Sequence, residues 1–262
     1  MRPAYLKEPV LDNFDFTQCP NADSITTAEK LATAKLYQEV IYELHKIEAY
    51  PGAKVALEKR QAVVDTVLPI IEATPNLKYI IELDKRRNYS TSIARESIRA
   101  NCDSIVETFL DDPLASTITD HLGRNLGMIC AYEGHEDLVL KALDNPQASR
   151  QQAHNGYNIG MVCAKNKLVS ATMKALDDNI ASAQQSLDSE TIGMICARII
   201  AGDSNMIPAF EKAASNPKTI LIKDGQGRTL FDIAKTSSYA GATIVEKFSK
   251  VLLQAQLMQE GM

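Results

Sequence analysis

The chain has 262 residues, and its 45% hydrophobic and 23% charged residues are ordinary proportions for a soluble globular protein. Its net charge of −5 argues against a nucleic-acid partner, because phosphate binding requires a surplus of Lys and Arg. No run of about 18 apolar residues occurs, so we expect no membrane span. The five cysteines contain no CxxC pair, which favours free thiols in a reducing compartment.

The first 25 residues contain three prolines together with scattered Asn and Asp residues. Such a composition predicts an extended N-terminal arm over residues 1–25. The arm has no apolar run of the length found in signal peptides. We therefore expect a cytoplasmic protein, which would leave its cell only by a route that needs no signal peptide.

Residues 26–86 have the pattern of a helical N-terminal region. Thr26 and Glu29 form a capping box, in which a hydroxyl and a carboxylate bind the unpaired amides at a helix start. Apolar residues then recur at helical spacing to about Tyr50, and a second helix is expected from about Ala53. Pro69 should kink or restart that second helix, because proline has no amide hydrogen.

Two further features complete this region. Pro51-Gly52 should end the first helix, and a third helix is expected from about Asn76 to Lys85. The run Lys85-Arg86-Arg87 is the only local basic cluster of the sequence. We interpret it as a helix end, where basic side chains are favoured, rather than as a nucleic-acid site.

From about residue 87 onward the sequence repeats itself with a period of 33. Residues at the start of each copy keep this spacing: Asn125, Asn158 and Thr191. A fourth copy begins at Asp224 after a slip of five residues, which we place around residues 201–204, between two helices. A more degenerate copy precedes them and is recognisable from Asn101.

A period of 33 with two short helices per unit is typical of the ankyrin repeat. The stretch DHLGRNLGMICAYEGHEDLVLKAL at 120–143 resembles the family pattern DxxGxTPLHxAAxxGHxEIVxxLL without a gap, and KDGQGRTLFDIA at 223–234 resembles it as well. The resemblance covers about 87–250 and implies an all-α ankyrin-repeat solenoid of four to five helix-turn-helix repeats. Residues 26–86 would then form an N-terminal helical cap. Residues 87–262 would end in an extended capping helix from Gly241 towards Met258, because both ends of a solenoid need a cover.

The copies differ from the family in the TPLH box, which becomes NLGM, NIGM, TIGM and TLFD. The Asn or Thr that opens each box can still cap the first helix of its repeat. The glycine in three of the boxes lowers helix propensity by about 1 kcal/mol, and we expect it to let the neighbouring methionine or an adjacent repeat come close. These glycines are Gly127, Gly160 and Gly193. Such degenerate boxes are similar to those of ankyrin proteins that intracellular bacteria deliver into host cells, which implies an effector acting in a host.

The cysteines of these copies resemble at first a catalytic or metal-binding set, with Cys130 five residues before His135. However, the step of 33 puts Cys130, Cys163 and Cys196 at one small position of successive repeats. Their separation should be about 8–10 Å, too far for one zinc ion or a disulfide. His135 falls at the glycine-histidine turn of the ankyrin pattern. We therefore expect structural roles for these residues, and we predict no metal and no cofactor.

Catalysis elsewhere in the chain has weaker support. Cys19 and His45 could form a thiol–imidazole pair, but the sequence contains no Gly-rich phosphate loop, no GxSxG and no HExxH motif. An enzyme with an unrecognised site in the N-terminal helical region, or in its groove with the repeats, stays open as the alternative function. A self-assembling scaffold is a third alternative, although we expect a monomer.

The principal hypothesis is a non-catalytic module that binds a partner protein, expected to be a host protein. In ankyrin proteins the turn tips and the outward residues of each first helix line a concave face, so the resemblance implies partner-binding positions there. Tyr and Arg are frequent in interface hot spots, which makes Arg124, Tyr132, Tyr157 and Arg198 the leading anchors. The full set is His121, Leu122, Arg124, Tyr132, Glu133, His154, Asn155, Tyr157, Lys165, Asn166, Leu187, Asp188, Glu190, Arg198 and Ile199.

Overall fold

The computed structural model describes residues 9–48, 53–84 and 89–237, together with a few separate positions between 245 and 257. The chain divides into two compact units, Met1–Leu126 and Gly127–Met262. Each unit buries apolar side chains, such as Phe109 in the first and Phe210 in the second. No helix among the described residues is long and apolar enough to cross a membrane.

Helix α1 (Thr27–Glu48) of the first unit begins at the predicted capping box. The backbone amide of Thr26 donates to Glu29 Oε2 over 2.8 Å, and the amide of Glu29 donates to Thr26 Oγ1 over 3.3 Å. The residues whose spacing predicted the helix are all buried: Tyr37, Val40, Ile41, Leu44 and Ile47. The first helix is therefore confirmed, while its expected end at Pro51-Gly52 lies outside the described residues.

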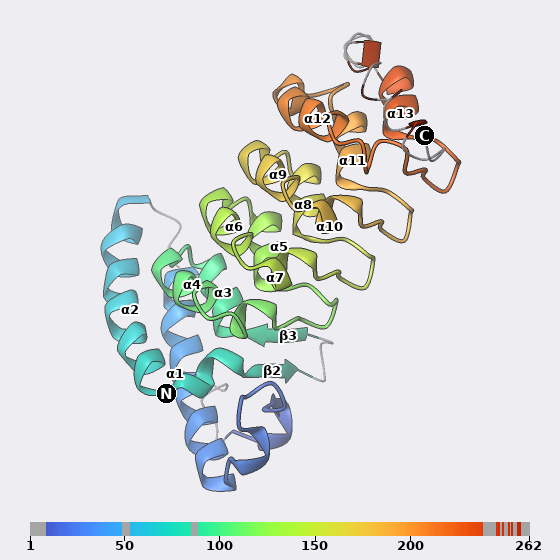
Figure 1. Ribbon diagram of the computed structural model, residues 1–262. Helices are drawn as coiled ribbons and strands as arrows, with labels where there is room; N and C mark the ends of the chain where they lie inside the picture. The colour runs from blue at the N-terminus through green and yellow to red at the C-terminus, as the bar shows by residue number, and fades with distance from the viewer. Residues whose placement is uncertain are drawn as a thin grey trace. The chain divides into compact units, whose positions relative to one another are not determined.

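Helix α2 (Ala53–Ala73) packs beside α1 and continues through Pro69, so the expected restart at this proline does not occur (Figure 1). Apolar side chains on both sides of the proline are buried, namely Val63, Val64, Val67 and Ile71. A proline inside a helix costs about 3 kcal/mol, whereas each buried Val or Ile side chain contributes roughly 1.5–3 kcal/mol. Packing of the apolar face therefore outweighs the local effect of the proline.

The expected third helix over 76–85 is wrong. The structure has a 3-10 helix, η4 (Pro75–Tyr79), followed by strand β2 (Ile81–Asp84). Strand β2 pairs antiparallel with β3 (Tyr89–Ser92) and, at its other edge, with β1 (Phe14–Asp15). A short apolar run fits a helix or a strand by its spacing, and here the two neighbouring strands decide the outcome. The basic run at 85–87, interpreted as a helix end, lies outside the described residues.

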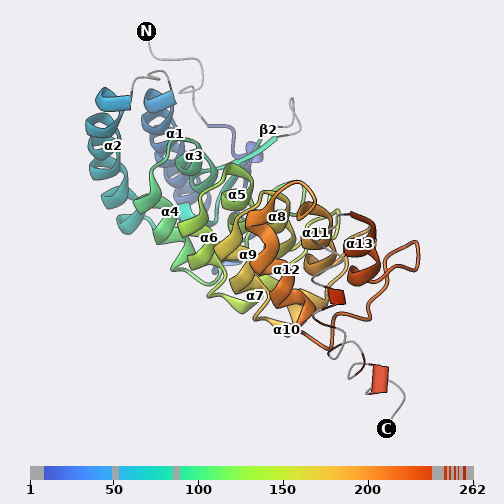
Figure 2. The same ribbon diagram turned by 90° about the horizontal axis from the view of Figure 1, so that it is seen from above.

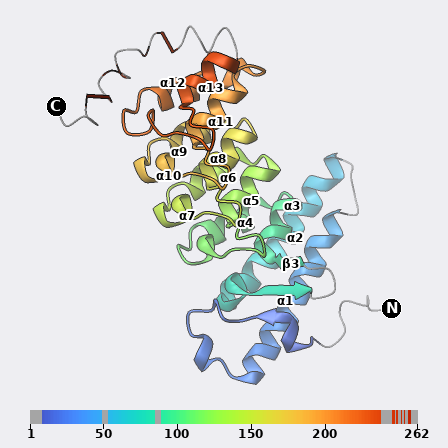
Figure 3. The same cartoon turned by 90° about the vertical axis from the view of Figure 1, so that its right-hand side faces the viewer.

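Residues 9–25 hold short elements in addition to extended backbone. Besides β1, they contain the 3-10 helices η2 (Leu11–Asn13) and η3 (Ala22–Ser24). Phe14 is buried, and its ring meets Tyr37 of α1 in an edge-to-face arrangement with centroids 5.5 Å apart. This aromatic contact holds the segment against α1, and Figure 3 shows the segment folded beside that helix. The predicted arm is therefore packed where it is described.

The first unit also contains the degenerate copy of the repeat that precedes the others. Helices α3 (Ile93–Arg99) and α4 (Asp103–Leu110) are followed by the 3-10 helix η5 (Ala115–Thr117). Ser92 caps α3 by accepting the amide of Arg95 over 3.2 Å, one period before Asn125. The boundary between the units thus falls after this copy. The division at residues 86 and 87, inferred from the sequence, stays a prediction.

The second unit is built from three rows of helices (Figure 2). The inner row comprises α5 (Leu126–Glu133), which starts at the unit boundary, α8 (Ile159–Lys165), α11 (Ile192–Ile199) and α13 (Leu230–Ser237). The outer row comprises α6 (Glu136–Ala142), α9 (Val169–Ala175) and α12 (Ile207–Ala214). The third row comprises α7 (Pro146–Arg150) and α10 (Asn179–Ala183). This arrangement confirms the predicted all-α stack of repeats, and the capping helix expected from Gly241 towards Met258 lies largely outside the described residues.

The third row was not expected, since the sequence pattern was interpreted as two helices per repeat. Each short helix of this row starts at an Asn or Asp cap. Asn145 Oδ1 accepts the amide of Gln147 over 3.0 Å, and Asp178 Oδ1 accepts the amide of Ile180 over 2.9 Å. Side-chain oxygens of this kind satisfy the unpaired amides of a helix start. The two caps are separated by one period, so the sequence did contain a signal for these helices.

The slip of five residues lies between α11 and α12. The inner helices α8 and α11 begin at Ile159 and Ile192, one period apart, whereas the outer helices α9 and α12 begin at Val169 and Ile207. The additional residues form a turn and the 3-10 helix η6 (Ser204–Met206). A surface turn accepts extra residues readily because few packing contacts are displaced. The predicted insertion point is confirmed.

Ion pairs and a cap connect the outer row. Lys174 Nζ lies 2.6 Å from Asp144 Oδ1 of the preceding repeat, and Lys212 Nζ lies 2.7 Å from Asp177 Oδ1 in the same way. Each exposed pair contributes only about 0–1 kcal/mol. Glu136 Oε1 also accepts the amide of Ala171 over 3.0 Å, in the first turn of α9. These bonds favour one register between neighbouring repeats.

The glycines of the inner helices allow successive repeats to approach closely. A Cβ on Gly127 would lie 2.8 Å from the Cβ of Ala142, and one on Gly160 would lie 2.7 Å from the Cβ of Ala175. Ile159 and Ile192 of the following inner helices fill the remaining space. Ala142 and Ala175 belong to the same repeat as the glycine, whereas Ile159 and Ile192 belong to the adjacent one, so the expectation that an adjacent repeat comes close is confirmed at Gly127 and Gly160.

We predict that Gly160→Ala destabilises the protein, although alanine normally favours a helix over glycine by about 1 kcal/mol. The added methyl would overlap the Cβ of Ala175, which the backbone holds in place, so the net loss should be about 1–3 kcal/mol. Urea unfolding followed by circular dichroism measures it. Gly202→Ala is the control, because nothing lies within 4 Å of a Cβ there. Equal losses in both variants would contradict the close-approach role.

Three helices end in a residue with left-handed backbone. The φ angles are 52° at Asn101, 84° at Gly134 and 63° at Lys167. In each case the next amide closes the helix, as when Leu168 donates to the carbonyl of Cys163 over 3.0 Å. The three residues are spaced by one period, so one type of helix end recurs with three different side chains.

We predict that Lys167→Gly stabilises the protein by about 1 kcal/mol, because a side chain in the left-handed region costs roughly 1–2 kcal/mol. The exposed pair of Lys167 with Asp203, at 3.3 Å, is worth less than this. A thermal melt should show a rise of about 2–4 °C. The reverse substitution, Gly134→Lys, should lower the melting temperature. A lower value for Lys167→Gly would count against this account of the helix ends.

Candidate functional site

The predicted partner-binding residues lie on the turn tips and at the ends of the inner helices. His121, Leu122 and Arg124 belong to the first unit. The exposed and half-exposed members in the second unit are here named the inner face: Tyr132, Glu133, His154, Asn155, Lys165, Asn166, Leu187, Asp188, Arg198 and Ile199. The two other predicted residues, Tyr157 and Glu190, are buried, with 4% and 5% of their surface exposed.

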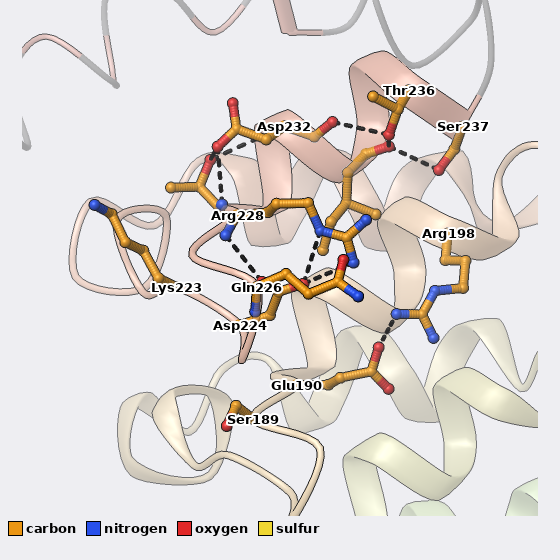
Figure 4. Close-up of polar contacts among 12 residues, drawn as sticks. Ser189, Glu190, Arg198, Lys223, Asp224, Gln226, Arg228, Asp232, Thr236 and Ser237 are labelled. Atoms are coloured by element: carbon orange, nitrogen blue, oxygen red, sulfur yellow. Dashed lines mark hydrogen bonds and ion pairs between the residues drawn. The ribbon is translucent and has the colours of Figure 1, made fainter.

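The predicted anchor Arg124 is engaged within its own turn. Its Nε and Nη2 donate to Asp120 Oδ2 over 2.9 and 2.6 Å, and its backbone amide donates to Asp120 Oδ1 over 3.0 Å. The same DxxGR turn recurs at Asp224 and Arg228, where Nε and Nη2 donate over 3.0 and 2.8 Å (Figure 4). A two-point bond fixes the plane of a guanidinium group. Arg124 therefore shapes the turn, and its contact with a partner stays a prediction.

The arginine also controls the ionisation of its aspartate. Burial alone would raise the pKa of Asp120, but hydrogen bonds from Arg124 and Leu122 outweigh it and hold the pKa below its ordinary value. The pKa of Asp224 is lowered in the same way, against the effect of burial, by the backbone and side chain of Arg228. A carboxylate whose pKa is lower in the folded than in the unfolded state stabilises the fold at a pH above its unfolded-state pKa. This stabilisation is lost as the pH falls through the folded-state pKa. Both turns should therefore weaken below about pH 4.

We predict that Asp120→Asn lowers the free energy of unfolding at pH 7 by about 1–3 kcal/mol, because charge-assisted hydrogen bonds are lost. The difference from the unchanged protein should shrink as the pH falls below about 4, where the aspartate of the unfolded chain becomes protonated, and should be lost as the pH falls through the lower pKa of Asp120 in the folded protein. Urea unfolding at several fixed pH values measures both effects. Asp188→Asn, at an exposed aspartate, is the control. A difference independent of pH would show that the charge of Asp120 is not responsible.

In the next two repeats, the last residue of the turn contacts a basic side chain at the end of the inner helix. Lys165 Nζ lies 4.6 Å from the centroid of the Tyr157 ring, and Arg198 Nη2 forms an ion pair with Glu190 (Figure 4). Tyr157 and Glu190 are one period apart, as are Lys165 and Arg198. A cation–π contact and an ion pair thus occupy the same place in successive repeats. The structure brings these four predicted residues together as two pairs.

A ladder of glutamines joins successive turns. Gln152 Nε2 donates to the carbonyl of Gly156 in its own turn and, over 3.0 Å, to that of Gln185 in the next repeat. Gln185 Nε2 likewise donates to Ser189 over 2.8 Å and to Lys223 over 2.9 Å. Sequence reasoning missed these glutamines, although their spacing of one period was a visible signal. Their hydrogen bonds hold the backbones of successive turns in a fixed arrangement.

The turn tips carry the most exposed side chains of the predicted set. Leu187 is 77% exposed, and its amide donates to the carbonyl of Asn155 in the preceding turn over 3.0 Å. In the first unit, the amide of His121 donates to Ser90 Oγ over 2.8 Å, and Leu122 is 45% exposed. The backbone of each tip is therefore held while the side chain of Leu187 or Leu122 points into solvent.

The repeated cysteines are core residues. Cys130, Cys163 and Cys196 have no exposed surface. Burial raises the pKa of Cys196 to about 12 and also raises that of Cys163, so both thiols are protonated at neutral pH. In the part of the chain that the structure describes, no group of three or more His, Cys, Asp or Glu side chains is placed to hold a metal ion.

Cys19 and His45, the weaker catalytic candidates, have different surroundings. The Cys19 thiol is buried, and its pKa is raised by that burial and by the nearby Asp15 carboxylate. His45 Nε2 lies 3.4 Å from Glu96 Oε2, and the other oxygen of this buried carboxylate accepts a hydrogen bond from Arg99 over 3.1 Å. The contact between His45 and Glu96 joins helices α1 and α3 within the first unit.

Comparison with known proteins found similarity at the level of structure. No family model and no curated protein matches the sequence. Among solved structures, an ankyrin repeat domain from Acinetobacter baumannii AYE is similar, with a TM-score of 0.55 and 15% sequence identity, over 75% of this chain and 94% of that one. A likeness at this low identity establishes the fold alone.

Proposed function

Because the chain has the ankyrin-repeat fold, we propose that it is a non-catalytic protein–protein interaction module whose inner face binds a partner protein. The main support is the inner face itself. It presents side chains from three successive repeats, at the same positions of each repeat, on helices and turns that are bonded to one another. Such a regular, extended surface is what repeat proteins offer to a partner.

The rigidity of the turns favours binding. The glutamine ladder and the bond from Leu187 to Asn155 hold the tips in place before a partner arrives. The turn at Asp224 is held by Arg228. A surface that is already ordered loses little conformational entropy on association, so more of the contact energy appears as affinity.

The structure changes which residues we expect to touch the partner. Tyr157 and Glu190 are buried beneath Lys165 and Arg198, so we assign them a supporting role. Tyr132 and Leu187 are 40% and 77% exposed, and they are the largest exposed apolar side chains of the inner face. Aromatic and apolar side chains that become buried on association contribute most of the binding energy of an interface.

We extend the proposal to a protein that acts inside a host cell as an effector, with a host protein as its partner. This extension rests on the degenerate TPLH boxes, which are similar to those of ankyrin proteins delivered by intracellular bacteria. Delivery into the host cell and a monomeric state are parts of the same proposal.

We predict that Tyr132→Ala combined with Leu187→Ser reduces, at least tenfold, the recovery of the partner by affinity capture from cell lysate. Mass spectrometry identifies and quantifies the captured proteins. The control is Ile180→Ser, which removes an apolar side chain of intermediate exposure, 54%, from α10 in the third row. Circular dichroism verifies that each variant is folded.

Two outcomes would contradict this proposal. If the double variant and the control recover the same proteins in equal amounts, the inner face is not the binding surface. If the unchanged chain enriches no protein over an unrelated bait of similar charge, the chain is not an interaction module under these conditions of capture, and the proposed function is wrong.

A further inference from the structure

Lys165 is a cation held at one place on the inner face. It is the last residue of α8, and its ammonium nitrogen lies 4.6 Å from the centroid of the Tyr157 ring. The ring is buried, whereas Lys165 is exposed. The face of an aromatic ring is electron-rich and attracts a cation. The contact therefore restricts an otherwise flexible side chain and presents its charge to solvent.

The charge of Lys165 is not neutralised by a neighbour. Arg198, one repeat later, forms an ion pair with Glu190, and Arg228 binds Asp224. Lys165 occupies the position of Arg198, but the place of Glu190 is taken by the uncharged Tyr157. In the part of the chain that the structure describes, no carboxylate lies within ion-pair distance of Lys165. The inner face thus has a fixed ammonium group that lacks a counter-ion.

Exposed apolar side chains flank this ammonium group along the stack. Tyr132 takes the same position as Lys165 in the preceding repeat, and Leu187 is at the tip of the following turn. Glu133 and Asp188 are also exposed on the inner face. The carboxylates of Glu133 and Asp188 would repel a polyanion such as a nucleic acid. A partner segment with a single carboxylate beside apolar residues would instead complement one ammonium group between apolar side chains.

We propose that Lys165 binds an Asp or Glu side chain of the partner protein, carried on a segment whose neighbouring residues are apolar and contact Tyr132 and Leu187. This inference rests on the proposed function, since it assigns a chemistry to the same face. Tyr157 then serves as a positioning residue, which holds the ammonium group above its ring and lowers the entropy lost when the carboxylate binds.

A random peptide library displayed on phage tests this assignment with the full chain as bait. The peptides selected by the unchanged chain should be enriched in Asp and Glu beside apolar residues. Lys165→Glu should reverse the preference towards Lys and Arg, and Lys165→Gln should bind the best acidic peptide roughly tenfold more weakly in a titration. Lys218→Gln, which removes an exposed lysine charge outside the inner face, should keep the acidic preference.

The outcomes separate this inference from the function on which it rests. Selected peptides without an acidic preference, or the same peptides selected by Lys165→Glu, would overturn the role of Lys165 while the interaction module stands. If no peptide is enriched on any bait, the role of Lys165 is overturned, whereas the interaction module is judged by the affinity capture described above. Thermal melts of the variants show that a changed preference does not come from unfolding.

Discussion

The close approach of neighbouring repeats at the inner helices is the constraint on which the second unit depends. A side chain larger than hydrogen at Gly127 or Gly160 would overlap the outer helix of its own repeat and the isoleucine of the next. Because each repeat buries its apolar face only against its neighbours, the distance between repeats determines both the core and the surface. At this distance the amide of Leu187 reaches the carbonyl of Asn155, and Gln152 reaches the carbonyl of Gln185.

One position of the turn shows how the repeats combine a constant backbone with a variable chemistry. Arg124, Tyr157, Glu190 and Arg228 all stand at the end of a turn. The two arginines bind the aspartate that opens the turn, the tyrosine lies under a lysine, and the glutamate pairs with an arginine. The repeats therefore keep the same geometry while the residue at this position and its partner change from repeat to repeat, and such variation on a constant backbone suits a specific binding surface.

The local signals of the sequence were reliable where a few adjacent residues decide the structure. The capping box at Thr26 and Glu29 and the slip between α11 and α12 depend on short-range bonds, and both are confirmed. The helix expected over 76–85 failed because β2 exists only through its pairing with β1 and β3. Among the candidate site residues, the turn and helix-end positions could be located from the period alone, but not their exposure. Nothing in the sequence distinguished the exposed Tyr132 from the buried Tyr157.

By itself, the sequence determined the period, the positions of the helix caps and the places where glycine is required, because each of these follows from backbone bonds within one repeat or from identity between repeats. Only the tertiary structure decided which side chains are buried or paired within the fold and which remain available to a partner. That decision depends on contacts eight residues or one whole period apart, such as Tyr157 with Lys165 and Gln152 with Gln185. Contacts between repeats form only after the repeats have stacked, and spacing along the chain did not show that the Lys165 ammonium group lies over the Tyr157 ring whereas Arg198 pairs with Glu190.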